Sequence, residues 1–152
     1  MKKCLTYLLV TMILINSMGL DVFATEIPIS ESITKLEDGS YYITVIEETT
    51  SPRSTTKSGT KTSRYYSSSD ELLWSVTVKG TFSYTGSSAK CTASSVSTTC
   101  PNDNWKITSK SSSKSGAKAS ATATAKRYAS SVPVQTVTKT VTLTCSPTGI
   151  LS

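Results

Sequence analysis

Alternation of bulky and small polar side chains predicts that this chain is built from β-strands. In the clearest segment, from Trp74 to Tyr84, apolar or aromatic residues take every second position, with Ser, Thr or Lys between them. Such alternation places one set of side chains on the buried face of a sheet and the other set in water. Gly80 interrupts the apolar set, which indicates a bend or bulge. We therefore expect one face of this strand to pack on a hydrophobic core.

Other segments show the same pattern and bring the predicted total to about seven strands. The predicted strands cover residues 41–46, 60–66, 74–84, 89–93, 105–107, 117–126 and 132–145. Alanine alone favours a helix, but its strict alternation with Ser and Thr at residues 117–126 favours a strand with a small inner face. Residues 109–116, which are mostly Ser and Lys, are expected to form a mobile loop.

Many short strands separated by turn signals, with no convincing helix, predict an all-β fold. We expect an antiparallel β-sandwich, for which an immunoglobulin-like topology is one arrangement, and a small closed β-barrel is the alternative. Residues 38–152 are expected to form this single domain. Residues 25–37 have an indistinct pattern and are expected to form a poorly ordered lead.

The first 24 residues have the features of a cleaved signal peptide. Lys2 and Lys3 precede an apolar run at residues 5–20, and Val22 and Ala24 supply the small residues expected before the cleavage point. The alternative is a membrane anchor, but the run is shorter than the roughly 20 residues that span a bilayer. We expect a secreted, extracellular protein cleaved near Ala24, with no transmembrane segment in the mature chain.

The amino-acid composition of the mature chain limits the kinds of partner that we expect. Residues 25–152 carry 14 basic and nine acidic residues, and 51 of these 128 positions are Ser or Thr. The basic residues form no cluster with interleaved aromatics, so nucleic acid is not an expected partner. The net charge of +5 either aids solubility alone or favours loose association with anionic wall polymers or lipid headgroups.

No catalytic or cofactor-binding pattern stands out. The chain contains no His, which excludes imidazole-based catalysis and histidine-bound zinc. The acidic pairs Glu37/Asp38, Glu47/Glu48 and Asp70/Glu71 are adjacent in sequence, so the two side chains of each pair should diverge on an extended backbone. Ser-x-x-Lys occurs six times, as a Ser- and Lys-rich chain allows, without companion hydrolase motifs. Residues 102–104 read as a turn rather than a calcium site. We expect a protein that is not an enzyme and holds no metal or cofactor.

Two surface features are candidates for binding. Alternate positions of the last predicted strand carry Thr136, Thr138, Thr140 and Thr142, which should line its outer face. Such a ladder is found on adhesive and ice-binding faces, although Thr is also simply a good strand former that tolerates water. Tyr65 and Tyr66 are candidates for stacking against a sugar ring.

Three cysteines remain after cleavage, so at most one disulfide can form within the chain. We favour a bond between Cys91 and Cys145, because both lie on inward faces and Trp105 lies between them in sequence, as in immunoglobulin-type sandwiches. Closing this loop would stabilise the fold by about 4 kcal/mol in the chain-entropy model, against about 2.7 for Cys91 with Cys100. Cys100 would then be a free thiol. A Cys91–Cys100 bond and three reduced thiols are the alternatives.

The run from Leu73 to Thr92, which reads LWSVTVKGTFSYTGSSAKCT, resembles a group of uncharacterised small secreted β-rich proteins of Gram-positive, clostridial-type bacteria. The resemblance extends to a later Trp, to the alternating Ala/Thr strand and to the ending Leu-Thr-Cys-Ser with a final Leu-Ser. It implies a bond between the cysteines at positions 91 and 145, whereas Cys100 departs from the group's pattern. It implies no activity.

These observations favour a secreted, non-enzymatic β-sandwich that acts by binding. The expected partner is a cell-wall polymer, a glycan or a surface protein. A small secreted antagonist, similar to a bacteriocin or toxin, is the alternative, and a histidine-free hydrolase is the least favoured reading.

Overall fold

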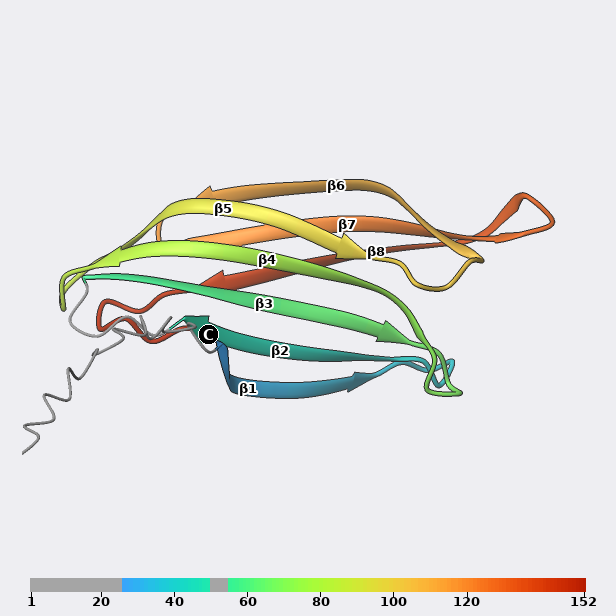
Figure 1. Ribbon diagram of the computed structural model, residues 1–152, viewed down its shortest axis with the longest axis horizontal. Coiled ribbons are helices and arrows are strands. Elements are labelled where there is room, and N and C mark those ends of the chain that lie inside the picture. The colour runs from blue at the N-terminus through green and yellow to red at the C-terminus, as the bar shows by residue number, and fades with distance from the viewer. Residues whose placement is uncertain (1–25, 50–54) are drawn as a thin grey trace, which may run out of the picture.

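The computed structural model describes residues 26–49 and 55–152, and this part of the chain is an all-β sandwich (Figure 1). The signal peptide predicted at residues 1–24 lies outside the described residues. The strands are β1 (Glu26–Lys35), β2 (Tyr41–Thr49), β3 (Thr56–Tyr66), β4 (Leu72–Tyr84), β5 (Ala89–Thr99), β6 (Trp105–Ser115), β7 (Lys118–Ala129) and β8 (Val132–Thr144). The prediction of an antiparallel sandwich is confirmed, with eight strands instead of about seven.

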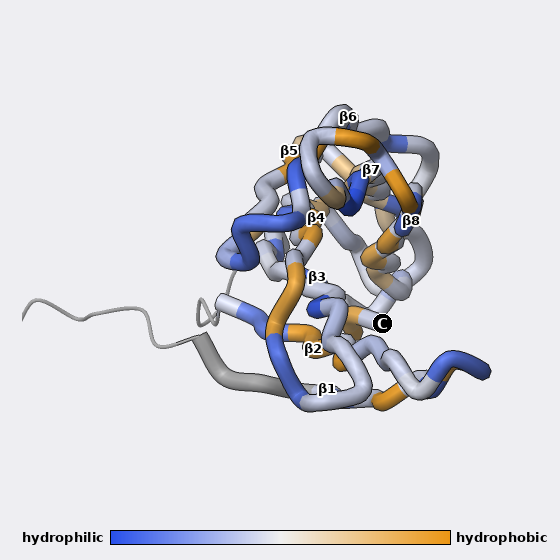
Figure 2. Tube along the Cα trace, turned by 90° about the vertical axis from the view of Figure 1, so that its right-hand side faces the viewer, coloured by the Kyte–Doolittle hydropathy of each residue, from blue (hydrophilic) through white to orange (hydrophobic). Residues whose placement is uncertain are grey.

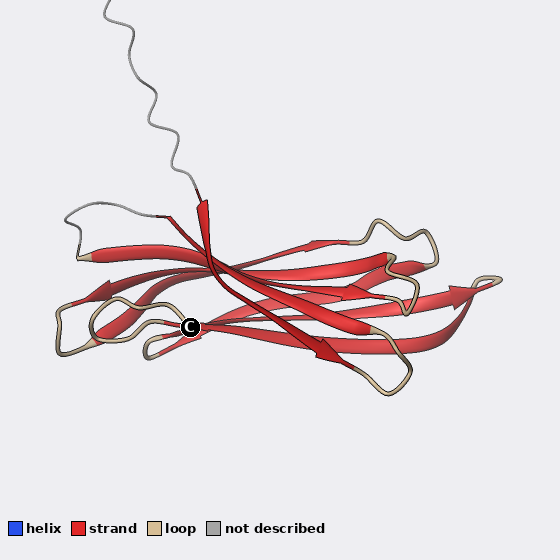
Figure 3. Ribbon diagram, turned by 90° about the horizontal axis from the view of Figure 1, so that it is seen from below, coloured by secondary structure: helices blue, strands red, loops and turns tan. Residues whose placement is uncertain are grey.

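The strands form two antiparallel sheets in which chain neighbours are also sheet neighbours. One sheet has the order β1-β2-β3-β4-β5 and the other the order β6-β7-β8, and the described strands do not close into a barrel. This double meander differs from the immunoglobulin arrangement, in which strands of one sheet are not consecutive in the chain. Figure 3 shows that the described turns gather at the two ends of the sandwich. Within the described ranges, no helix has the length and apolar character needed to cross a membrane.

The core lies between β4 and β7. The apolar face of β4 supplies Trp74, Val76, Val78 and Phe82, all fully buried, as the alternation predicts. The opposing face of β7 consists of buried alanines at positions 119, 121, 123 and 125. Small side chains on one sheet leave room for large ones on the other, which explains the alanine strand. Figure 2, which looks along the strands, shows that β6, β7 and β8 lie beside β4 and β5. In the same view β1 and β2 lie farther away, at the other edge of the five-stranded sheet.

Gly80 has a steric role in this core. A β-carbon at this position would lie 2.6 Å from both Cε2 and Cζ of Phe82 and 3.0 Å from Cβ of Ala119. Gly80 itself pairs in register with Gly59 and Ser94; the register of β4 with β5 shifts only after Thr81, where the extra residue lies on β5, so the bulge expected at the glycine is on the neighbouring strand. The ring of Phe82 therefore occupies the space that any larger residue at position 80 would need.

Two segments are more regular than the sequence predicts. Residues 26–35, expected within a poorly ordered lead, pair with β2 as an edge strand. Residues 109–115, expected in a mobile loop, continue β6 and pair with β7. Side chains of β6 also reach β5: Ser112 Oγ donates to the carbonyl of Ser94 at 3.5 Å, and Lys114 Nζ donates to the carbonyl of Thr92. A sequence without apolar residues can thus form a strand, because its backbone pairs on one side and its polar side chains bridge to the other sheet.

The cysteines occupy the predicted positions, but the predicted bond is absent from the structure. Cys91 and Cys145 are buried, Cys100 is half-buried, and all three are free thiols. The backbone amides of Cys91 and Cys145 donate to the carbonyls of Gly116 and Ala117, so both residues flank the β6–β7 turn. Each sulfur instead donates to a nearby carbonyl, Cys91 Sγ to Ala93 at 3.2 Å and Cys145 Sγ to Ser146 at 3.4 Å. Burial raises the pKa of both thiols, which disfavours the thiolate.

Candidate functional site

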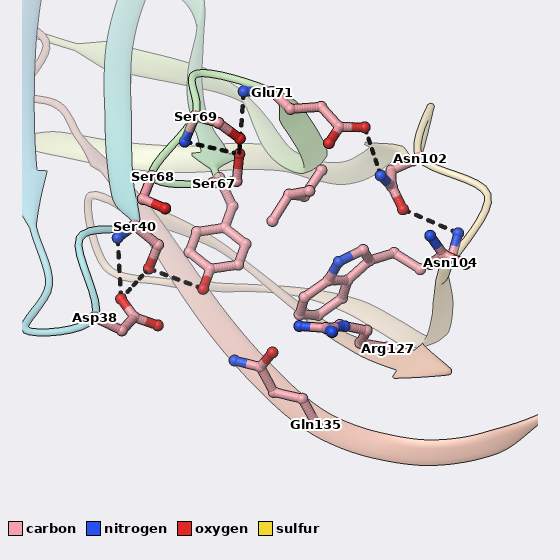
Figure 4. A pocket seen from close by; sticks show the side chains of 13 residues that line it. Asp38, Ser40, Ser67, Ser68, Ser69, Glu71, Asn102, Asn104, Arg127 and Gln135 are labelled. Carbon is pink, nitrogen blue, oxygen red and sulfur yellow. Dashed lines mark hydrogen bonds between the residues drawn. The ribbon is translucent and has the colours of Figure 1, made fainter. Parts of the chain in front are cut away.

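A polar pocket lies at one end of the sandwich, where turns from both sheets meet (Figure 4). Its volume is about 340 Å³. The β1–β2 turn, the β3–β4 turn and the β5–β6 loop form three of its sides, and β7 and β8 close the fourth. The polar residues that line it are Asp38, Ser40, Ser67, Ser68, Ser69, Glu71, Asn102, Asn104, Arg127 and Gln135.

The floor of the pocket is aromatic and belongs to the core. Tyr65 and Trp105 are only 3% and 5% exposed, and their rings meet edge to face with centroids 5.8 Å apart. Tyr65 also stacks on Tyr42 at 4.9 Å and contacts the edge of Trp74 at 6.0 Å. Because four rings pack against one another, the aromatic floor is held firmly in place beneath the pocket.

A hydrogen-bond chain runs from this floor to the rim. The hydroxyl of Tyr65 donates to Ser40 Oγ at 3.0 Å, and the hydroxyl of Ser40 donates to Asp38 Oδ1. The backbone amide of Ser40 donates to the same oxygen at 3.0 Å. These bonds from Ser40 hold the pKa of Asp38 below its ordinary value, so the carboxylate stays ionised at neutral pH. Asp38 is thereby fixed as an acceptor at the pocket rim.

The opposite rim is built from two interlocked turns. Ser67 Oγ accepts the amides of Ser69 at 3.3 Å and Glu71 at 3.2 Å, which orients the β3–β4 turn. In the β5–β6 loop, Asn102 Oδ1 accepts the amide of Asn104 at 2.9 Å, so residues 102–104 form a turn as predicted. Asn102 Nδ2 then donates to Glu71 Oε1 at 2.6 Å and joins the turns of the two sheets.

The pocket therefore offers fixed acceptors and donors around a rigid floor. Two carboxylates accept hydrogen bonds, Arg127 donates them, and the amides of Asn104 and Gln135 can do both. The described residues contain no group of three or more His, Cys, Asp or Glu side chains placed to hold a metal ion. This set of groups is suited to a ligand that carries both donors and acceptors.

The predicted site residues are divided between the pocket and other surfaces. Tyr65 lies at the pocket floor, buried rather than exposed. Its neighbour Tyr66 faces away from the core and stacks on Tyr41 with centroids 5.1 Å apart and planes 8° from parallel. The hydroxyl of Tyr41 donates to Asp70 at 2.8 Å. The two predicted tyrosines therefore do not form one site.

The threonine ladder lies on the outer face of the three-stranded sheet, as the alternation predicts. Its central members are engaged with hydroxyls of β7: Thr138 with Thr124 at 2.9 Å, Thr140 with Thr122 at 2.8 Å and Thr142 with Ser120 at 2.9 Å. Thr136 is exposed on the same face. The paired hydroxyls satisfy each other's hydrogen-bonding capacity. None of the ladder threonines lines the pocket.

Sequence reasoning missed most of the pocket because its residues come from separate turns. Asp38 and Glu71 each belong to an acidic pair, and one member of each pair lines the same pocket. Arg127 and Gln135 are paired residues near the end of the β7–β8 hairpin. Their convergence follows from the order of the strands, which residue spacing alone does not give.

Comparison of the chain with protein-family models, with curated proteins and with solved structures finds no match.

Proposed function

We propose that this protein is a secreted, non-enzymatic binding protein that holds a glycan in the pocket at the end of the sandwich. The observation that carries the proposal is the combination of a rigid aromatic floor with fixed donors and acceptors on the rim. Each hydroxyl of a sugar both donates and accepts, so a mixed set of amides, carboxylates and a guanidinium is a suitable partner. The signal peptide predicted at residues 1–24 supports an extracellular site of action.

The size of the pocket supports a small part of a glycan as the bound unit. Its volume of about 340 Å³ is at the lower end of the range of about 300–1,000 Å³ for small-molecule sites. The terminal sugar of a chain, or one sugar with part of the next, is of this order. The rest of a wall polymer or surface glycan would extend into solvent.

The charges in the pocket support binding rather than hydrolysis. Glycoside hydrolysis needs one carboxyl that is protonated at working pH and donates its proton to the leaving group. Asp38 has a lowered pKa and is suited to remain an acceptor. Glu71 Oε1 already accepts a hydrogen bond from Asn102 Nδ2 within the fold, and this bond ties the carboxylate to the β5–β6 loop.

Binding of isolated wall polysaccharide, peptidoglycan fragments and mucin-type glycans tests the proposal. We expect the wild-type chain to be retained by at least one of these, and Arg127→Ala and Gln135→Ala to reduce retention at least about tenfold, because each would leave ligand groups unpaired. Thr140→Ala is the matched control. Thr140 lies on the outer face of the three-stranded sheet, away from the pocket, so this variant should bind as wild type. Circular dichroism confirms that each variant folds.

Two outcomes would contradict the proposal. Retention that is unchanged by both pocket variants but lost in the Thr140 variant would place binding on the threonine ladder. Release of reducing sugar from a retained glycan, abolished by Glu71→Gln, would make the pocket an active site instead of a binding site.

A further inference from the structure

The hairpin formed by β7 and β8 carries apolar side chains that nothing in the fold covers. Two residues with positive φ, Ser130 at 48° and Ser131 at 69°, make its tight turn. Figure 1 shows this hairpin projecting farther than the other described turns at its end of the molecule. Directly after the turn, Val132 is 60% exposed and Val134 is 54% exposed, with the exposed Pro133 between them. Exposed aliphatic residues grouped at a projecting tip indicate a contact surface.

The three-stranded sheet that carries the tip is positively charged and has no carboxylate of its own; the carboxylates that line the pocket, Asp38 and Glu71, belong to turns of the other sheet. Residues 104–152, which include the whole three-stranded sheet, contain six lysines and one arginine but no Asp or Glu. Lys106 and Lys126 are directly paired across β6 and β7 near the tip, and the ring of Tyr128 lies 5.4 Å below Lys106 Nζ. Like charges opposite each other destabilise a sheet. The arrangement therefore opposes folding slightly and favours an anionic partner.

From these two observations we infer that the tip of the β7–β8 hairpin docks on the surface of a bilayer that contains anionic phospholipids. Val132 and Val134 enter the boundary between headgroups and acyl chains, and Lys106 and Lys126 lie at the level of the phosphates. A soluble anionic polymer would attract the lysines but gives the valines nothing apolar to enter. A second copy of the chain would bring two positively charged tips together, which opposes self-association through this surface.

The inference is independent of the glycan proposal, because neither valine and neither of the two lysines lines the pocket. The two sites nevertheless lie at the same end of the sandwich, since Arg127 and Gln135 of the same hairpin line the pocket. A docked molecule would hold the pocket close to the membrane surface. Glycan binding measured without vesicles tests only the pocket, and vesicle binding measured without glycan tests only the tip.

Co-sedimentation with vesicles is the test. Residues 25–152, which contain every described strand, are mixed with vesicles of phosphatidylcholine alone and of phosphatidylcholine with phosphatidylglycerol. We expect partitioning to the anionic vesicles only, and weakening as salt is raised. Replacing both valines by Asp should lower the partition coefficient at least about tenfold, because charge opposes entry into the apolar boundary. Lys106→Gln or Lys126→Gln should lower it about fivefold each.

Two controls separate the tip from the rest of the surface. Ile150→Asp changes an exposed aliphatic residue that is 66% exposed at the other end of the molecule, and Lys79→Gln removes an exposed cation of the five-stranded sheet. Both should partition as wild type. The substituted positions are exposed, apart from the partly buried Lys126, so unchanged thermal unfolding is expected and confirms that the variants fold.

Three results would overturn the inference. The first is no binding to anionic vesicles at low salt. The second is binding that the valine substitutions leave unchanged, which would indicate a purely electrostatic contact. The third is binding that depends equally on the control residues, which would place the contact elsewhere.

Discussion

The contact between Gly80 and Phe82 predicts that the smallest possible enlargement of position 80 destabilises the fold. In Gly80→Ala the new methyl group would lie 2.6 Å from two carbons of the Phe82 ring, whereas ordinary contacts between such atoms are 3.4–4 Å. The ring is fully buried and cannot swing into solvent. Ala119, 3.0 Å away on the opposing sheet, prevents the backbone of β4 from moving toward it.

The expected cost is that of overpacking a filled core, about 1–3 kcal/mol of unfolding free energy. For a domain of this size, this lowers the melting temperature by about 4–11 °C. Urea unfolding followed by tryptophan fluorescence measures the change, because Trp74 and Trp105 are buried in the folded state. Lys79→Ala, an exposed change on the same strand, serves as the control and should alter stability by no more than about 0.5 kcal/mol.

A second substitution identifies the cause. In a Phe82→Leu background the ring is gone, so adding the methyl group at position 80 should cost clearly less than it does alone, and the double-mutant cycle should show a coupling of at least about 0.5 kcal/mol. A Gly80→Ala protein as stable as wild type would refute the steric argument. An equal cost in both backgrounds would assign the effect to the backbone of β4 at position 80 instead of the ring.

Three further predictions concern titratable side chains. The hydrogen bonds from Ser40 lower the pKa of Asp38, so the stability that the Asp38 carboxylate contributes is complete above the ordinary pKa of 3.8 and is lost as the pH falls below that value. Asp38→Asn should reduce this loss of stability at acidic pH, as acid unfolding would measure. Burial raises the pKa of Tyr42 from 10.0 to about 12, so stability should fall as pH rises through this interval and Tyr42→Phe should remove that fall, as alkaline unfolding would measure. Because Cys91 and Cys145 are buried and burial raises the pKa of both thiols, both should react slowly with iodoacetamide in the folded protein at neutral pH, and rapid labelling found by mass spectrometry would contradict this.

The strands with strong alternation could be predicted from the sequence, because period two depends only on which residues are buried. The inward face of β4 and the small alanine face of β7 follow directly from this pattern. The strand at residues 109–115 could not be recognised in this way, since both of its faces are polar and its order depends on pairing with β7. The β-propensity of a residue describes that residue alone, whereas an edge strand such as β6 is stabilised by the backbone of the strand with which it pairs.

The pocket could not be predicted for a related reason. Asp38, Glu71 and Arg127 are far apart in the chain and lie next to turns that have no distinctive motif. Only the alignment of strand ends brings them together, and this depends on the number and order of strands. Tyr65, which the sequence suggested as an exposed ring for stacking against a sugar, lies at the pocket floor as a buried support instead.

The consecutive order of strands has a consequence for how the protein forms. Within each sheet, every strand after the first pairs with the strand that precedes it in the chain, so each layer is built as a series of hairpins with no crossover. A chain that emerges from its N-terminus can thus complete the five-stranded layer before the three-stranded layer exists. Only the final closure of one layer over the other requires the whole polypeptide, and that step also assembles the pocket.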